Sequence, residues 1–173
     1  MASLMENLLD VLDGECNEYD TLLELSRKKT PVIVAGKIEE LEKITDEEQN
    51  VVDRINRLDK KRAEVTTDIA NVMNKDVTQL KITNIIELLA QRPEEQKKLA
   101  GIYDRLQTTI REMVRINEHN KELIESSLEM VDFNLGLLQA MRSAPETADY
   151  TKNAINAGNT YGGSFSGVFD AKQ

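Results

Sequence analysis

Apolar side chains recur at steps of three and four residues along most of this chain, which is the spacing that places them on one face of an α-helix. The first regular stretch begins near residue 3, and its apolar face consists of Met5, Leu8, Leu12, Tyr19 and Leu22. Cys16 falls on the same face, where a small buried thiol is expected. The pattern predicts a helix near residues 3–29.

Local signals for a helix end follow this stretch. Lys28 and Lys29 are typical of a helix C-terminus, and Thr30-Pro31 offers an N-cap followed by a proline at the first position of a new helix. Gly36 interrupts the chain again after the apolar run VIVA. We therefore predict a break or kink at Thr30-Pro31 and a tight reversal or offset between residues 30 and 37.

The next stretch has the most regular pattern in the sequence. Its seam positions alternate steps of three and four without a slip, and they are Leu41, Ile44, Glu48, Val51, Ile55, Leu58, Arg62, Val65, Ile69 and Val72. Such a seam predicts a helix near residues 37–73 with a coiled-coil partner, which is either another helix of this chain or the same seam of a second copy. Glu48 and Arg62 either extend their charged ends to water or pair with a neighbouring helix and fix its register.

Two further helices are predicted, a short one near residues 79–91 and a long one near residues 94–142. The apolar stripe of the long helix consists of Leu99, Tyr103, Leu106, Ile110, Met113, Ile124, Leu128, Val131, Leu135 and Leu138. Asn117 and Asn120 interrupt this stripe, and they either fix the register of a buried seam or mark a looser place where a partner enters. A helix of this length is ~70 Å long at ~1.5 Å per residue, so a rod is expected.

The composition changes from residue 143 onward. Four of the eight glycines and four of the seven tyrosines and phenylalanines lie there, whereas leucine and methionine do not occur after Met141. Each glycine lowers helix stability by up to ~1 kcal/mol relative to alanine. The predicted fold class is all-α: an elongated antiparallel helical bundle or coiled-coil rod over residues 1–142, with a flexible C-terminal tail over residues 143–173.

The aromatic residues of the tail have helical spacing. Tyr161, Phe165 and Phe169 share one face if residues 159–170 become helical, and Val168 flanks them. Fully burying four such side chains contributes ~6–12 kcal/mol, whereas fixing a dozen backbone residues costs ~12–24 kcal/mol. A groove must therefore supply the difference through further contacts and hydrogen bonds. That groove belongs either to a partner or to the chain's own stripe near Leu128 to Met141.

Charge and composition narrow the class of protein. The chain has 173 residues, with 22 lysines and arginines against 31 aspartates and glutamates, and a net charge of −9. This balance disfavours nucleic acid and an anionic membrane surface as partners. No apolar run approaches the roughly 18 residues of a membrane span, so stable membrane insertion is not expected. Cys16 is the only cysteine, which fits a reducing compartment and a cytoplasmic location.

Signals for catalysis are missing from the sequence. His119 is the only histidine, and Ile116 stands three residues before it, so the paired Glu-x-x-His motifs of a di-iron bundle cannot form. Glu118 beside His119 disfavours an incoming phosphoryl group, and no phosphate loop or nucleophile elbow occurs. We therefore expect neither an enzyme nor a cofactor or metal site.

The order of several segments resembles a known family. The segments LLELSRKK, VAGKIEELEKITDEEQNVV, RLDKKR, RINEHNKELIESSLEMVDF and the final FDAKQ occur in this order along the chain. Each is unspecific alone, but together they resemble the FlgN-like family of flagellar export chaperones, which are small acidic helical proteins of the bacterial cytoplasm. The resemblance covers essentially the whole chain, and Thr30-Pro31 departs from a smooth first helix.

The resemblance implies a function and a site. The chain would bind hook–filament junction proteins through its C-terminal part, prevent their premature assembly or degradation, and be received by the type III export apparatus. The alternative is a structural coiled-coil adaptor that joins two folded partners through its seam, and self-association stays open. The candidate residues for protein binding are Tyr161, Phe165, Val168, Phe169, Leu128, Val131, Leu135 and Leu138.

Overall fold

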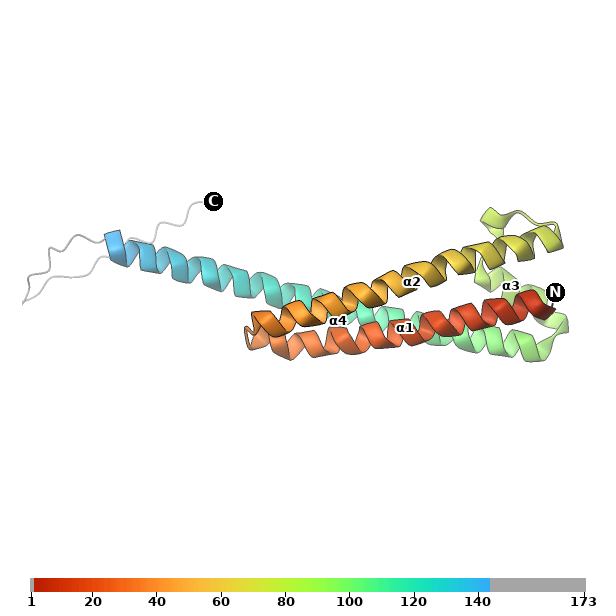
Figure 1. Ribbon diagram of the computed structural model, residues 1–173, viewed down its shortest axis with the longest axis horizontal. Helices are drawn as coiled ribbons and strands as arrows, with labels where there is room; N and C mark the ends of the chain where they lie inside the picture. The colour runs from red at the N-terminus through yellow and green to blue at the C-terminus, as the bar shows by residue number, and fades with distance from the viewer. Residues whose placement is uncertain (1, 144–173) are drawn as a thin grey trace, which may run out of the picture. The chain divides into compact units, whose positions relative to one another are not determined.

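The computed structural model describes residues 2–143, and every regular element over that range is helical. The elements are α1 (Ala2–Val34), α2 (Ile38–Met73), the 3-10 turn η1 (Val77–Gln79), α3 (Ile82–Leu88), the 3-10 turn η2 (Leu89–Gln91) and α4 (Pro93–Ser143) (Figure 1). This confirms the predicted all-α class and its helical bundle. Of the predicted tail, only Ser143 lies within the described residues, as the last residue of α4.

The chain divides into two units, residues 1–130 and residues 131–173. The first unit contains α1, α2, the short connecting elements and α4 up to residue 130. Of the second unit the structure describes residues 131–143, which are the C-terminal part of α4. The helical bundle is therefore a property of the first unit.

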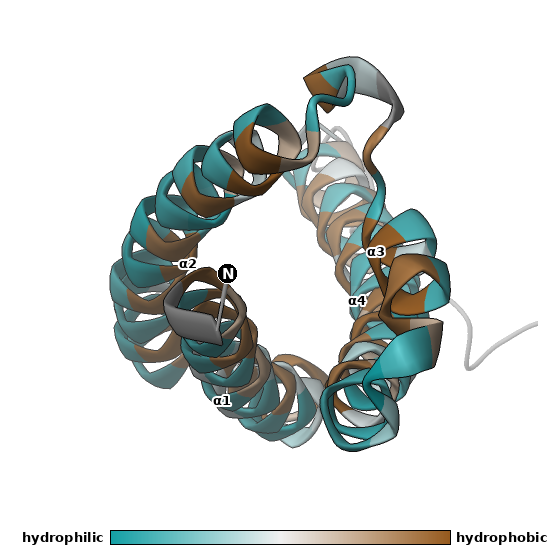
Figure 2. Ribbon diagram, turned by 90° about the vertical axis from the view of Figure 1, so that its right-hand side faces the viewer, coloured by the Kyte–Doolittle hydropathy of each residue, from teal (hydrophilic) through white to brown (hydrophobic). Residues whose placement is uncertain are grey.

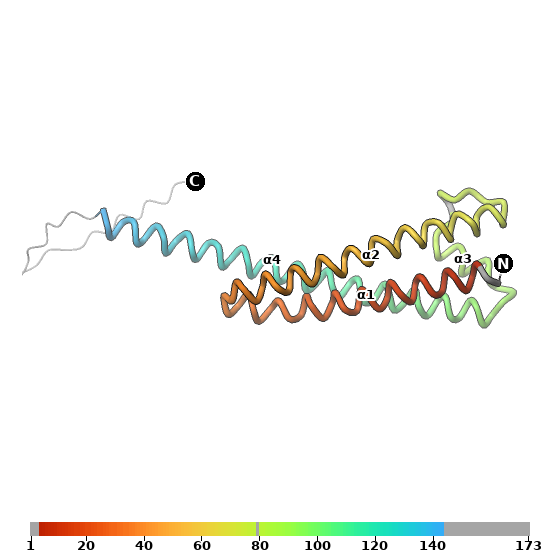
Figure 3. The backbone as a smooth tube through the Cα atoms, viewed as in Figure 1, coloured from red at the N-terminus to blue at the C-terminus, as the bar shows by residue number. Residues whose placement is uncertain are grey.

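Helices α1 and α2 run antiparallel side by side and form the most closely packed pair (Figure 3). The turn between them is a Schellman motif, in which the Gly36 amide donates to Ile33 O (3.0 Å) and the Lys37 amide donates to Val32 O (3.1 Å). Gly36 takes the left-handed conformation that this motif needs, with φ of 65°. The reversal predicted between residues 30 and 37 therefore occurs at its C-terminal end.

Of the predicted break or kink at Thr30-Pro31, the break is wrong, because Pro31 lies inside α1 and the helix continues to Val34. The kink stays a prediction. Tertiary contacts on both sides of the proline explain why the helix continues. Ile33 is buried, and the Thr30 hydroxyl donates to the side chain of Asn120 on α4 at 2.7 Å. These contacts hold the last turns helical although Pro31 cannot donate the usual backbone hydrogen bond.

The connection between α2 and α4 is more segmented than the single short helix predicted. Asn74, with φ of 53°, ends α2, and its amide and that of Lys75 donate back into the last turn. Asp76 caps η1 by accepting from the Thr78 amide at 2.9 Å. Pro93 then begins α4, where its missing N–H is harmless.

Figure 2 shows α1, α2 and α4 arranged around a common axis. Two clusters of buried apolar side chains form the core. The larger cluster contains Met5, Leu8, Leu12, Cys16, Val65, Ile69, Ala70, Leu80, Ile85, Leu89, Leu99 and Leu106. The smaller one contains Leu22, Leu25, Val51 and Ile55. Tyr19 packs against both clusters, so the core is continuous along the bundle.

Most of the α2 seam packs inside the chain, whereas Val72 at its C-terminal end is exposed. Val51, Ile55, Val65 and Ile69 are all buried against α1 and its neighbours. Gly14 of α1 faces Leu58 of α2, since a Cβ atom added at Gly14 would lie 3.4 Å from Leu58 Cδ2, within ordinary van der Waals contact. These side chains are therefore not free to form the seam of an adaptor or of a second copy.

Candidate functional site

A buried amide joins α4 to α1. Asn120 is 3% exposed, and its Nδ2 donates to Ser26 O at 2.8 Å while its Oδ1 accepts from the Thr30 hydroxyl. A buried amide with both ends bonded fixes the axial position of one helix against another. The structure therefore favours the register-fixing interpretation for Asn120, whereas Asn117 is exposed.

The two charged seam residues of α2 both pair with α1. The Glu48 carboxylate accepts from Lys29 Nζ at 2.8 Å and from the Ser26 hydroxyl at 3.5 Å. Arg62 Nε lies 3.0 Å from a carboxylate oxygen of Glu15 and forms an ion pair with it. Of the two alternatives, pairing with a neighbouring helix therefore holds for both residues.

Glu15 is the most deeply buried carboxylate of the described chain. Burial raises its pKa above the ordinary value of 4.5, and the neighbouring Arg62 guanidinium offsets part of that effect. Arg62 itself is one third exposed and also bonds to Asp59. A half-buried ion pair of this kind links α1 to α2 but presents no group to a substrate.

A further polar contact ties α1 to α4. Asp20 accepts from Arg105 and from the Thr109 hydroxyl, the latter at 3.0 Å. The Arg105 guanidinium also donates to the Asn17 side chain at 3.2 Å. These polar side chains have structural partners, and none is placed as an acid, base or nucleophile toward an open site.

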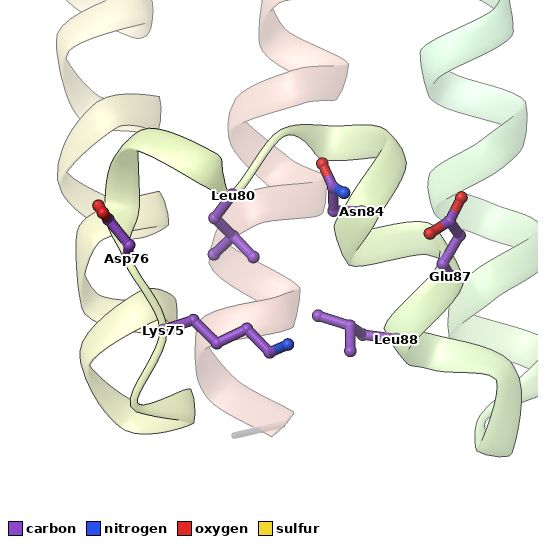
Figure 4. A pocket seen from close by; sticks show the side chains of 6 residues that line it. All are labelled: Lys75, Asp76, Leu80, Asn84, Glu87 and Leu88. Carbon is purple, nitrogen blue, oxygen red and sulfur yellow. The ribbon is translucent and has the colours of Figure 1, made fainter.

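An open pocket of about 440 Å³ lies at the connection between α2 and α3. Figure 4 shows its polar side chains on separate sides, with Lys75 extending toward Leu88. Asp76 is committed to capping η1, and Asn84 Oδ1 accepts from the Lys81 amide at 3.2 Å. The pocket therefore contains no set of converging free groups.

The remaining chemical candidate is His119, which is exposed on α4. Within residues 2–143 no cluster of three or more histidine, cysteine, aspartate or glutamate side chains could hold a metal ion. None of the helices in the described part is long and apolar enough to cross a membrane.

The C-terminal part of α4 exposes a dense group of large apolar side chains. We call residues 128–141 the apolar segment. Eight of its side chains are between 51% and 71% exposed: Leu128, Met130, Val131, Phe133, Leu135, Leu137, Leu138 and Met141. Exposed apolar groups of this density mark protein or membrane interaction sites, ligand-binding grooves or surfaces that favour aggregation.

Four of the predicted site residues form one stripe of this segment, which we call the first stripe: Leu128, Val131, Leu135 and Leu138. They follow the same helical spacing as the buried residues Leu99 and Leu106 of α4. The other predicted site residues, Tyr161, Phe165, Val168 and Phe169, lie outside the described residues. Contact between them and the first stripe is thus still a prediction.

A second stripe of the apolar segment was missed by sequence reasoning, and it consists of Met130, Phe133, Leu137 and Met141. Its steps of three, four and four residues are also helical. It lies off the face that continues the core. Its sequence signal is the positions of the apolar residues after residue 127 around the helix.

Comparison with known proteins gives two matches. A family model described as FlgN protein matches residues 1–162. A relative from Bacillus subtilis (strain 168), described as uncharacterized protein YvyG, is 23% identical over 131 residues, which cover 76% of this chain and 78% of that protein. No solved structure matches the chain.

Proposed function

This chain belongs to the FlgN family, and from that premise we propose that it is a cytoplasmic chaperone of flagellar type III export that binds hook–filament junction proteins. It would hold these substrates through the apolar segment and the tail, prevent their premature assembly or degradation, and deliver them to the export apparatus. No catalysis is required for this role, since holding and release depend on binding alone.

The exposed apolar segment is the observation that carries the proposal. Burying an exposed leucine- or phenylalanine-sized side chain contributes ~1.5–3 kcal/mol, so eight such residues offer a large driving force for association. A permanently exposed surface of this kind favours aggregation unless it is covered in use. A net charge of −9 opposes aggregation of the unloaded protein.

The internal use of the α2 seam argues for this role over that of a coiled-coil adaptor. An adaptor that joined partners through Val51, Ile55 or Val65 would have to open the bundle first, because these side chains are buried within it. The apolar segment requires no opening of the bundle to become accessible. Binding through the segment is therefore favoured over binding through the seam.

Titration calorimetry of the full-length chain with a purified hook–filament junction protein tests the proposal. Replacing Val131 and Leu135 together by serine should weaken binding at least about tenfold, or ~1.4 kcal/mol. The matched control replaces Val34 and Val72 by serine, since both are exposed apolar residues outside the segment.

Unchanged affinity in the Val131/Leu135 variant would reject the apolar segment as the substrate site. Absence of any binding by the unaltered chain would reject the substrate class itself. Equal weakening by the Val34/Val72 control would show that general surface hydrophobicity, rather than the segment, drives the interaction.

A further inference from the structure

The two stripes of the apolar segment point in different directions around α4. At about 100° per residue, each stripe is about 80° wide and their centres lie about 135° apart. Asn134 lies in the narrow gap between them, and together they make an apolar face about 220° wide. A helix that packs against one neighbour needs a stripe only about 100° wide. One partner helix therefore covers one stripe and leaves the other in water.

The remaining side of the segment is acidic. Asp132 stands four residues after Leu128 and borders the first stripe, whereas Glu129 stands four residues before Phe133 and borders the second stripe. Both carboxylates are exposed. Glu125 precedes them on the same side of the helix. A partner helix packed on either stripe would therefore lie beside carboxylates of α4.

We propose that the apolar segment is clasped by two amphipathic helical segments of one partner chain, one on each stripe, with lysines or arginines facing the acidic side of α4. This rests on the proposed function, since the partner is the chaperone's substrate, and it specifies what the bound part of that substrate must look like. The segment is ~20 Å long at ~1.5 Å per residue, so each partner helix needs about four turns.

The distance between the two partner helices sets the linker between them. Two helices packed about 10 Å from α4 and 135° apart are about 18 Å from each other. A linker of about six extended residues spans that distance at ~3.3 Å per residue. Joining both helices in one chain makes the second binding step intramolecular, which favours one clasping partner over two separate ones.

Charge argues against a second copy of this chain as the occupant. Residues 121–143 carry four carboxylates, Glu122, Glu125, Glu129 and Asp132, against two cations, Lys121 and Arg142. The whole chain has a net charge of −9. Pairing two apolar segments would bring like charges together, whereas a basic partner gains from the same carboxylates.

Designed peptides can test the proposal before a natural substrate is identified. The single probe is an 18-residue amphipathic helix with leucines at heptad spacing and flanking lysines. The tandem probe joins two such helices by about ten glycine and serine residues, whose typical reach is about 17 Å. Titration calorimetry on the full-length chain should give two single probes per chain, and one tandem bound about 10²-fold more tightly than a single probe.

Two stripe variants locate the binding. Phe133→Ser with Leu137→Ser disables the second stripe, and Val131→Ser with Leu135→Ser disables the first. Each variant should bind only one single probe and lose the tandem's advantage. Because all four residues are exposed, the helix content measured by circular dichroism should not change.

The Val34→Ser with Val72→Ser control should keep two single probes and the full tandem affinity. Binding of one single probe by the unaltered chain, or a second-stripe variant with undiminished tandem affinity, would overturn the proposal. If Phe165→Ala with Phe169→Ala raised the number of bound single probes from one to two, the chain's own tail would be the occupant instead.

A charge reversal tests the acidic edge. Glu129→Lys with Asp132→Lys should weaken the lysine-flanked tandem at least tenfold and strengthen a tandem whose lysines are replaced by glutamates. Equal affinity for both tandems would overturn the charge assignment. Concentration-dependent dimers in light scattering that disappear in the second-stripe variant would assign that stripe to a second copy.

The outcomes separate this inference from the proposed function. If a purified junction protein binds and the second-stripe variant leaves its affinity unchanged, the clasp is wrong and the chaperone role stands. If the tandem binds as described but the junction protein does not, the clasp stands and the substrate class is wrong.

Discussion

The two ends of α4 follow the same apolar spacing and have opposite surroundings. In the N-terminal part, Leu99 and Leu106 are buried in the larger apolar cluster, and the polar anchors Thr109 and Asn120 bond to α1. In the apolar segment every large apolar side chain is at least half exposed. The apolar spacing marks a face of the helix that can pack against another surface. The polar anchors determine which helix packs there and in what register. In the proposed function, a stripe without such anchors can bind partners of different sequence.

The largest effect on stability, and the sharpest contrast with the apolar segment, is expected from a substitution in the bundle core. Leu12→Ala removes a side chain that is fully buried, so it should lower the free energy of unfolding by ~2–5 kcal/mol through lost burial and a cavity. Urea denaturation followed by circular dichroism measures it. Junction-protein affinity below the unfolding transition should not change, and a loss of both together would break the separation between the two regions.

Removing a register anchor should have the next largest effect. Asn120→Ala leaves the Ser26 carbonyl and the Thr30 hydroxyl without their partner, which is expected to lower the free energy of unfolding by ~1–3 kcal/mol. Asn117→Ala is the matched control, because Asn117 is exposed on the same helix. Similar unfolding midpoints for the two variants would contradict the anchoring role.

Loss of the tail aromatics should affect binding and spare stability. Phe165→Ala with Phe169→Ala is expected to weaken junction-protein binding at least tenfold, ~1.4 kcal/mol. Helix content and thermal unfolding should stay nearly unchanged. Titration calorimetry decides between outcomes: unaltered affinity rejects the tail as a binding element, and a marked fall in melting temperature favours docking of the tail on its own chain.

The Glu15–Arg62 pair should respond to pH. Arg62→Met removes the cation that offsets the burial of Glu15, whose pKa is already raised by burial. A carboxyl group whose pKa is raised by folding stabilises the folded state at pH values below its ordinary pKa. This stabilisation is lost as the pH rises through the pKa of the folded state. Arg62→Met should therefore lower the free energy of unfolding more at neutral pH, where Glu15 is charged, than at pH 4. The loss at neutral pH should be about 1 kcal/mol, because Arg62 is partly exposed. An equal cost at both pH values would contradict this account.

The smallest effect is expected for single changes within the apolar segment. Leu135→Ala should alter the free energy of unfolding by less than about 0.5 kcal/mol, because the side chain is half exposed before the change. Comparison with Leu12→Ala under the same conditions gives the contrast directly. A cost above about 2 kcal/mol, the range of a buried leucine, would mean that the segment is covered in the free protein.

The periodicity of apolar residues predicted the helices of this chain better than local helix-end signals did. The regular seam of α2 and the long stripe of α4 were visible in sequence because burial on one face repeats with the helical period. The Thr30-Pro31 signal failed because contacts of Ile33 and Thr30 with the rest of the bundle outweighed one missing hydrogen bond.

The ion-pair partners of the charged seam residues could not be predicted from the apolar pattern. Glu48 and Arg62 stood out as charged seam residues, but their partners Lys29 and Glu15 depend on how α1 lies against α2. The first stripe of the candidate site was predicted as an extension of the core face. The second stripe, which includes Phe133, does not continue the core face of the bundle and was therefore not predicted.

The burial of Cys16 has a kinetic consequence. This thiol is fully buried, its Sγ donates to Ile102 O at 3.5 Å, and burial raises its pKa, so a thiol reagent reaches it only when the bundle opens. Since the chain has one cysteine, its labelling rate reports local or global opening of the helices without interference from other sites. The native residue thus serves as a probe of whether a partner on the apolar segment slows the opening of the bundle.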